Sequence, residues 1–201
     1  MTLPRFYQIV DDARWLERFV PLGLELVQLR IKDRPREELR AQIRAAREIC
    51  GTDCQLIVND HWELALEEGC DFIHLGQEDL DGADLDAIRG LRLGVSTHDG
   101  AELARGLSVD PAYIALGPVF PTILKQMKWA PQGAERVTEW KAQIAPLPLV
   151  AIGGLTVERA AAIWAAGADT ICVVTDVLLN PEPEQRLARW LALARETDPA
   201  R

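Results

Sequence analysis

LIVNDHWELALEEGCDFIHLGQEDL, residues 56–80, reads as a strand, a short helix and a second strand. The apolar runs Leu56–Val58 and Phe72–Leu75 are short, which is typical of strands that are covered on both faces. Between them, Trp62–Glu68 combines apolar residues with glutamates, as a surface helix does. Because a helix carries the chain from one strand to the next, we expect the two strands to be parallel neighbours.

An acidic residue follows each of these strands, Asp60 after the first and Asp79 after the second. Parallel neighbours end at the same edge of a sheet, where ligands bind in such folds, so we expect both carboxylates at one rim. Two convergent carboxylates suit Mg²⁺, which takes one or two carboxylates together with water and substrate phosphates. On this pattern alone, two solvated loop acids remain the alternative.

A polar row is expected at the end of another strand, Leu26–Arg30. Strand side chains repeat with period two, so Gln28, Arg30 and Lys32 point the same way if the extended geometry persists. Such a row can bind the oxygens of a diphosphate, Arg through its planar fork and Lys as a point charge. An exposed strand edge followed by a basic loop is the other interpretation.

The alternation of strands and helices continues along the whole chain. Further strands are expected at Phe6–Val10, Leu91–Val95, Tyr113–Gly117, Leu147–Ile152 and Thr170–Val174, with a short helix at Asp84–Gly90 and a longer one at Gly133–Ile144. About eight strand-helix units result, the number that closes a barrel. We therefore predict an α/β fold, a TIM (β/α)8 barrel, as a single domain over residues 1–201. A doubly wound open sheet is the structural alternative.

Three loops carry residues suited to ligands. Residues 118–133 hold three prolines and no regular apolar pattern, which favours an active-site lid over a merely flexible insertion, with Thr122 and Lys125 available for anionic oxygens. Gly153–Gly154 would let backbone N–H groups approach a phosphate, which barrels of this kind commonly bind after their seventh and eighth strands. In the third loop, the hydroxyls of Ser96 and Thr97 can bond a ligand or cap the next helix, and for Thr97 and Asp99 we expect the cap.

Composition limits the classes of function. The net charge is −9, from 31 acidic and 22 basic residues, and the bases are scattered, which argues against a nucleic-acid surface but not against a small phosphorylated substrate. Neither a secretory signal nor an apolar run long enough for a bilayer is present, so we expect a cytoplasmic protein without membrane contact. Cys50, Cys54, Cys70 and Cys172 form no CxxC pair and are expected to be buried or reduced thiols.

Collinear blocks run through nearly the whole chain: VQLRIKD at 27–33, VNDHWELALEEGCDFIHLGQEDL at 58–80, LGVSTHD at 93–99, YIALGPVFPT at 113–122 with Lys125 and APQG at 130–133, and AIGGL at 151–155. They resemble the thiamine phosphate synthase family. The resemblance implies a TIM barrel and a transferase that joins 4-amino-5-hydroxymethyl-2-methylpyrimidine diphosphate to hydroxyethylthiazole phosphate. The implied products are thiamine phosphate and diphosphate, the implied metal is Mg²⁺, and the family's dimerisation implies a homodimer by analogy.

The resemblance also implies a role for each matching residue. Asp60 and Asp79 look like the Mg²⁺ ligands. Contacts to the pyrimidine diphosphate are implied for Gln28, Arg30, Lys32 and Asn59, and a contact to the pyrimidine for Ser96. Contacts of the lid to the diphosphate are implied for Thr122 and Lys125, and the thiazole phosphate site for Gly154, Val174 and Thr175. The implied reaction resembles an ionisation, in which diphosphate departs and the thiazole nitrogen captures the pyrimidine cation. Arg30, Lys32 and Lys125 are then catalytic candidates, because charge on the leaving group must be neutralised. Ser96, the implied pyrimidine contact, is the fourth candidate.

Three positions depart from the family pattern. Leu124 stands where a second lid hydroxyl is usual, Lys128–Trp129 are unusual in the lid, and Asp176 follows Thr175 where a small residue is usual. A carboxylate beside a substrate phosphate would repel it unless it points away. Two other functions of the same barrel therefore stay open, a thiazole tautomerase and a non-catalytic phosphate-binding regulator.

Overall fold

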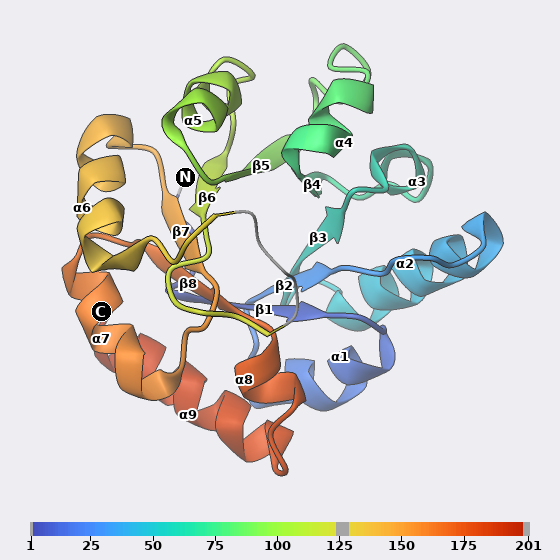
Figure 1. The fold of residues 1–201 in the computed structure, drawn as a ribbon. Helices are drawn as coiled ribbons and strands as arrows, with labels where there is room; N and C mark the ends of the chain where they lie inside the picture. The colour runs from blue at the N-terminus through green and yellow to red at the C-terminus, as the bar shows by residue number, and fades with distance from the viewer. Residues whose placement is uncertain (1, 124–128, 199–201) are drawn as a thin grey trace.

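The computed structural model describes residues 2–123 and 129–198. Within them, eight parallel strands pair in sequence order and close into a barrel, with the first strand next to the last. The strands are β1 (Phe6–Val10), β2 (Leu26–Leu29), β3 (Gln55–Asn59), β4 (Phe72–Leu75), β5 (Arg92–Thr97), β6 (Tyr113–Leu116), β7 (Leu149–Ile152) and β8 (Thr170–Val173). Figure 1 shows them at the centre with the helices around them. The predicted (β/α)8 barrel is confirmed, and the open sheet is excluded.

At least one helix follows each strand on the outside of the barrel. The helices are α1 (Arg14–Phe19), α2 (Arg36–Cys50), α3 (Trp62–Glu67), α4 (Gln77–Gly82), α5 (Gly100–Leu107), α6 (Gly133–Ile144), α7 (Val157–Ala165), α8 (Thr175–Leu178) and α9 (Pro183–Glu196), with the 3-10 helix η1 at Val20–Leu22. The helix expected at Asp84–Gly90 is wrong. This segment forms turns, in which the carboxylate of Asp84 accepts bonds from the backbone N–H groups of Asp86 and Ala87 at 3.0 and 3.1 Å.

Side chains of the strands alternate between two apolar cores. One core lies inside the barrel and consists of Tyr7, Ile9, Leu26, Ile57, Phe72, Tyr113, Ala115, Val150 and Cys172. The other, larger core lies between the strands and the helices. Inside the barrel, Gly94 leaves room for the ring of Tyr113, because a Cβ at Gly94 would stand 2.2 Å from the Tyr113 Cζ atom. Period two therefore places residues such as Gln28, His74 and Ser96 on the inner side, above this apolar layer.

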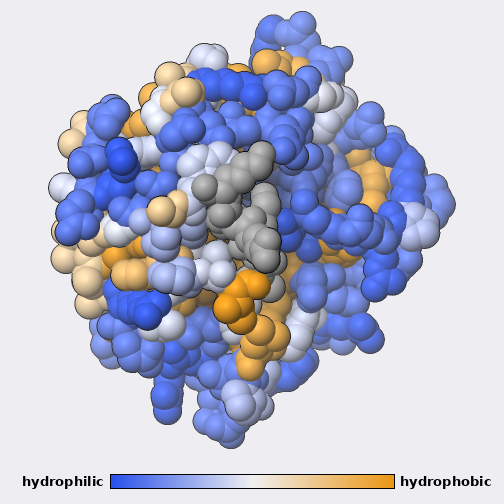
Figure 2. Space-filling view, in the orientation of Figure 1, coloured by the Kyte–Doolittle hydropathy of each residue, from blue (hydrophilic) through white to orange (hydrophobic). Residues whose placement is uncertain are grey.

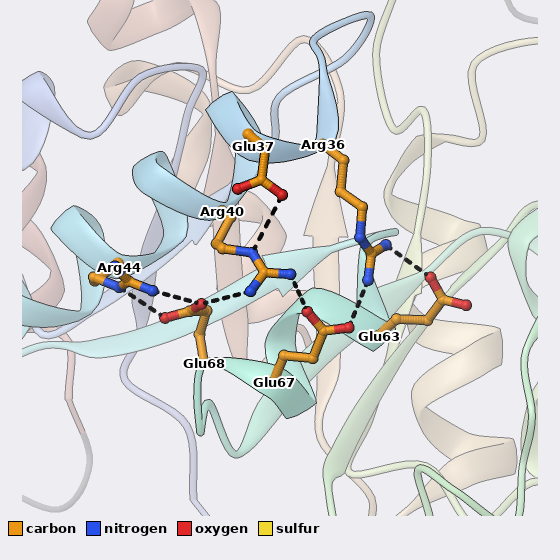
Figure 3. A network of polar contacts seen from close by, with 7 residues as sticks. All are labelled: Arg36, Glu37, Arg40, Arg44, Glu63, Glu67 and Glu68. Atoms are coloured by element: carbon orange, nitrogen blue, oxygen red, sulfur yellow. Dashed lines mark hydrogen bonds and ion pairs between the residues drawn. The ribbon is translucent and has the colours of Figure 1, made fainter.

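A network of ion pairs joins the outer faces of α2 and α3 (Figure 3). Arginines on α2 alternate with glutamates on α3 and on α2 itself, and the members are Arg36, Glu37, Arg40, Arg44, Glu63, Glu67 and Glu68. Most of these side chains are substantially exposed, so each pair contributes little to stability. Arg36, Arg40 and Arg44 are thus engaged by glutamates of α2, α3 and the residue after α3.

The face in Figure 2 is mostly hydrophilic, with a small group of apolar atoms over α8. Leu179, directly after α8, is 65% exposed. Among residues 2–123 and 129–198, none of the helices combines the length and the hydrophobicity that crossing a membrane requires.

Candidate active site

A cavity of about 90 Å³ lies inside the barrel, near the carboxyl ends of the strands. All eight strands contribute lining residues, which are Tyr7, Ile9, Gln28, Asn59, His74, Ser96, Ala115, Val150, Ile152 and Cys172, together with Arg30 just after β2. Four predicted site residues, Gln28, Arg30, Asn59 and Ser96, are thus brought to one cavity. Carboxyl ends of parallel strands are where barrels of this kind place their ligands.

Asp60 and Asp79 converge at the rim, as the parallel order predicts. Asp60 follows β3 with a left-handed φ of 62°, and its backbone N–H donates to the His74 carbonyl at 3.0 Å. Asp79 lies in the first turn of α4, which follows the neighbouring strand β4. Burial raises the pKa of Asp60, the adjacent Asp79 carboxyl raises it further, and Lys32 and Arg30 oppose the shift. The two carboxyls thus interact, while Asp79 itself is exposed, and their role as a metal site stays a prediction.

This pair of carboxyls fits a hard divalent cation. Two carboxylates that face each other repel, and a cation between them would relieve the repulsion. Within the described residues, no third His, Cys, Asp or Glu side chain joins them to complete a metal-binding group. The pair matches the ligand set of Mg²⁺, which commonly keeps several waters and binds substrate phosphates.

The polar row after β2 lies at the same rim. β2 pairs with β1 on one side and β3 on the other, and Gln28 is only 2% exposed, so the alternative of an exposed strand edge is wrong. The Gln28 amide donates to the Tyr7 hydroxyl. Lys32 is half-exposed, and its Nζ atom lies 3.9 Å from an Asp60 carboxylate oxygen. Gln28 and Arg30 line the cavity while Lys32 reaches the carboxyl pair, so the row spans both parts of the site.

Asn59 presents an unsatisfied donor to the cavity. It ends β3 and is 4% exposed, and its side-chain Nδ2 group has no hydrogen-bond partner within the part of the chain that the structure describes. A buried amide without a partner is destabilising by about 1–3 kcal/mol, and a ligand acceptor in the cavity would remove that penalty. The unpaired amide of Asn59 therefore indicates that the cavity binds a polar ligand.

A row of hydrogen-bonded side chains inside the barrel was not predicted from the sequence. His74 Nε2 lies 2.7 Å from the Ser96 hydroxyl, and His74 Nδ1 lies 2.7 Å from the Tyr113 hydroxyl, which is 3.2 Å from the Tyr7 hydroxyl. Burial, and then the charge of Arg30, lowers the pKa of His74 to about 3, so the ring is neutral at pH 7. Period two on β1, β4 and β6 is the signal that could have found these residues, since it places their polar tips in the barrel. These hydrogen bonds, through His74, fix the orientation of the Ser96 hydroxyl.

The two ends of the predicted lid, residues 118–133, are hydrogen-bonded to each other and to the end of β7. The Val119 and Phe120 N–H groups donate to the Ile152 and Gly153 carbonyls at 2.9 and 3.0 Å, and the Gly133 N–H donates to the Val119 carbonyl at 3.0 Å. Thr122 is partly buried. Lys125, with Leu124 and Lys128, lies outside the described residues. The role of the segment as a lid stays a prediction.

Trp129, one of the departures from the family pattern, stacks on a residue after β5. Its ring centroid is 4.0 Å from that of His98, with the planes 12° apart. His98 Nδ1 lies 2.7 Å from a Glu102 carboxylate oxygen, which agrees with a structural rather than a catalytic histidine. Trp129 therefore fixes the second end of the 118–133 segment to the loop between β5 and α5.

Gly153 and Gly154 are required by the close approach of the 118–133 segment. Both have positive φ, 100° and 62°. A Cβ at Gly154 would stand 2.4 Å from the Pro121 carbonyl oxygen, and one at Gly153 would stand 2.7 Å from the Pro118 Cα atom. The phosphate role predicted for Gly154 is compatible with this packing and stays a prediction. On the neighbouring strand, Val174 packs against the inner core, and Thr175 begins α8.

The carboxylate of Asp176 points away from Thr175 and toward α9, so it would not repel a phosphate bound beside Thr175. The Arg186 guanidinium binds its two carboxylate oxygens at 2.8 and 2.9 Å, and the Trp190 indole N–H donates to it at 2.7 Å. The carboxylate is therefore neutralised by α9 and does not face a ligand bound beside Thr175.

Comparison with known proteins agrees with this geometry. Residues 6–177 match a family described as thiamine monophosphate synthase. The chain is 61% identical over 195 residues to the thiamine-phosphate synthase of Rhizobium etli, covering 96% of each chain, and 46% identical over 192 residues to that of Neisseria meningitidis, covering 94% of each. In fold it is similar to a thiamine phosphate pyrophosphorylase from Pyrococcus furiosus, with a TM-score of 0.85, 23% identity and 96% of each chain covered.

Proposed function

Because the chain belongs to the thiamine monophosphate synthase family and is a transferase of thiamine biosynthesis, we propose that it condenses a pyrimidine with a thiazole. The substrates are 4-amino-5-hydroxymethyl-2-methylpyrimidine diphosphate and hydroxyethylthiazole phosphate, and the products are thiamine phosphate and diphosphate. The observation that carries this proposal is the convergence of Asp60 and Asp79 beside Lys32, at the mouth of a cavity that contains Arg30.

Asp60 and Asp79 would hold Mg²⁺ together with oxygens of the leaving diphosphate. When bound, Mg²⁺ supplies positive charge that stabilises the departing group. The proximity of the two carboxyls supports this assignment, because a cation between them would relieve the repulsion that raises the pKa of Asp60. Lys32, near Asp60, is positioned to contact the same diphosphate oxygens.

The cavity would hold the pyrimidine. Ser96, oriented by His74, and the unpaired amide of Asn59 supply polar groups for its ring nitrogens and amino group. Arg30 and Gln28 line the route from the cavity to the diphosphate. A protein nucleophile is not needed, because the electron-rich aminopyrimidine can stabilise the cation that remains when the diphosphate departs.

The thiazole phosphate would bind beside Gly154, Val174 and Thr175. These residues follow β7 and β8, the pair of strands after which barrels of this kind commonly bind phosphate. Ile152 and Cys172, which precede Gly154 and Val174 by two residues, line the cavity, so a thiazole held there would face the pyrimidine. The 118–133 segment, with Thr122 and Lys125, would exclude water that could otherwise trap the cation.

We propose a cytoplasmic location, which is supported by the biosynthetic role of the family. A homodimer is proposed by analogy with the family alone.

Asp60→Asn tests the metal assignment. We expect this variant to lose thiamine phosphate formation by at least about a hundredfold, because one metal ligand and its charge are removed. Glu63→Gln is the matched control, because it removes an acid three residues away that pairs with Arg36 on the outer face. Wild-type rates in Asp60→Asn, at any Mg²⁺ concentration, would refute the assignment.

A further inference from the structure

Asp176 is held by an unusually complete set of donors. Two Arg186 nitrogens and the Trp190 indole N–H bind it, and the side chains of Asp176 and Arg186 are each only 11% exposed. A planar guanidinium that binds both oxygens of a carboxylate fixes direction as well as distance. The second residue of α8 is therefore tied firmly to α9.

The same guanidinium reaches a second helix. Arg186 Nη1 and Nη2 bind the two carboxylate oxygens of Glu158 at 2.9 and 3.0 Å. This contact lowers the pKa of Glu158 to about 2. Glu158 lies in the first turn of α7, and α9 packs against both α7 and α8 (Figure 1). One arginine on α9 thus joins the first turns of two helices.

Each of these first turns is continuous with one half of the proposed phosphate site. α7 follows the Gly153–Gly154 loop, and the Arg159 guanidinium in its first turn donates to the Gly154 carbonyl at 2.6 Å. α8 begins at Thr175, directly before Asp176. The spacing between the Gly154 loop and the Thr175 turn is therefore set through Arg186, which touches neither.

We propose that Arg186, acting through Asp176 and Glu158, is a positioning residue that holds the Gly154 loop and the Thr175 turn at the spacing that the thiazole phosphate requires. This inference rests on the proposed function for the identity of the ligand. It assigns the carboxylate of Asp176 a supporting role at a phosphate site, although its charge alone would disfavour phosphate.

Two accounts of Asp176 make opposite predictions. If the charge of Asp176 only repels the phosphate, Asp176→Ala should leave the KM for the thiazole phosphate unchanged or lower it. If it anchors α8, the same variant should raise that KM about tenfold, within the range that residues coupled through one network show. Arg186→Met should raise it at least as much, because it breaks the connections to both Asp176 and Glu158. The KM for the pyrimidine diphosphate should change less than about twofold in either variant, since its contacts lie on other strands.

Lys141→Met is the control for loss of a partly buried ion pair. Lys141 binds Asp169 at 2.7 Å, just before the start of β8 and so at the opposite end of the barrel from α8. Both KM values should stay near wild type in this variant. Urea unfolding of every variant checks that it is folded, and Arg186→Lys, which keeps the charge but loses the planar fork, replaces Arg186→Met if the latter does not fold.

Amide hydrogen exchange without substrates gives a readout that does not depend on activity. Faster exchange at residues 153–156 and 175–178 together is expected in Arg186→Met, and not in Lys141→Met. Unchanged exchange there, or an unchanged or lower KM for the thiazole phosphate in Asp176→Ala, would overturn the inference. Wild-type protein that folds but forms no thiamine phosphate would instead refute the proposed function.

Discussion

Buried polar residues decide what the inside of this barrel can bind. His74 is 6% exposed and bonds hydroxyls on both ring nitrogens, and Asn59 leaves a donor unpaired beside it. A fully apolar interior would be more stable, because buried polar groups lose their hydration. Their presence at the carboxyl ends of the strands, above an apolar layer, is therefore the physical mark of a ligand site.

His74 should make the fold sensitive to acid. Its folded-state pKa of about 3 lies below the ordinary value of 6.5, so the unfolded chain binds more protons between these two pH values. Stability from this group is complete above pH 6.5 and falls as the pH is lowered, by about 2 kcal/mol at pH 5. Urea unfolding at pH 7 and pH 5 should show a smaller loss in His74→Gln than in wild type. Equal losses in the two proteins would contradict the prediction.

Residues that follow strands were the easiest to predict from the sequence. The order of parallel strands alone brings Asp60 and Asp79 together, and the cap expected for Asp99 is confirmed by its 2.9 Å bond from the Glu102 N–H. The cap expected for Thr97 is wrong, because its hydroxyl is buried and donates to the Ala115 carbonyl at 2.9 Å. The partners of Asp176 lie on another helix, so only the folded chain reveals them.

Two short helices carry much of this site, and neither was predicted from the sequence, although the equally short α3 was. α4 holds Asp79 and α8 holds Thr175, yet they have only six and four residues. Such segments are too short to show a helical period, and isolated helices of that length are unstable. Packing on the barrel supplies their stability. The longer α6 was predicted with its observed limits, because twelve residues display the period clearly.

The α2–α3 network in Figure 3 should contribute little to the stability of the fold. Glu67 pairs with both Arg36 and Arg40, but its side chain is 40% exposed. Exposed pairs are worth about 0–1 kcal/mol and weaken in salt. Glu67→Gln should therefore lower the free energy of unfolding by less than about 1 kcal/mol at low salt. The difference should shrink further at high salt, and a larger loss that persists there would contradict this assessment.

The closure of the barrel could be predicted from the number of strand-helix units in the sequence. About eight strand-helix units in the sequence indicated closure, and the pairing of β1 with β8 confirms it. Closure brings residues from opposite ends of the chain to one cavity, for example Tyr7 and Cys172. The size and lining of that cavity could not be predicted, because they depend on how side chains such as Tyr113 fill the interior opposite Gly94.

The net charge of the chain does not describe the charge at the rim, where two bases accompany the two acids. The chain carries a net charge of −9, yet Arg30 and Lys32 lie beside the carboxyl pair at the rim. Local groups therefore decide whether a diphosphate binds, since charges farther than about 10 Å away are screened at physiological salt. A small anionic substrate is compatible with an acidic protein for this reason.

The most direct test combines the two proposed substrates with the wild-type protein. The pyrimidine diphosphate and the thiazole phosphate are mixed with the protein in Mg²⁺ or in EDTA, and thiamine phosphate is followed by its conversion to fluorescent thiochrome. We predict thiamine phosphate and diphosphate in equal amounts with Mg²⁺, and a rate close to zero in EDTA. Folded protein that forms no thiamine phosphate, or forms it equally fast in EDTA, would contradict the central claim that this rim carries out a metal-assisted condensation.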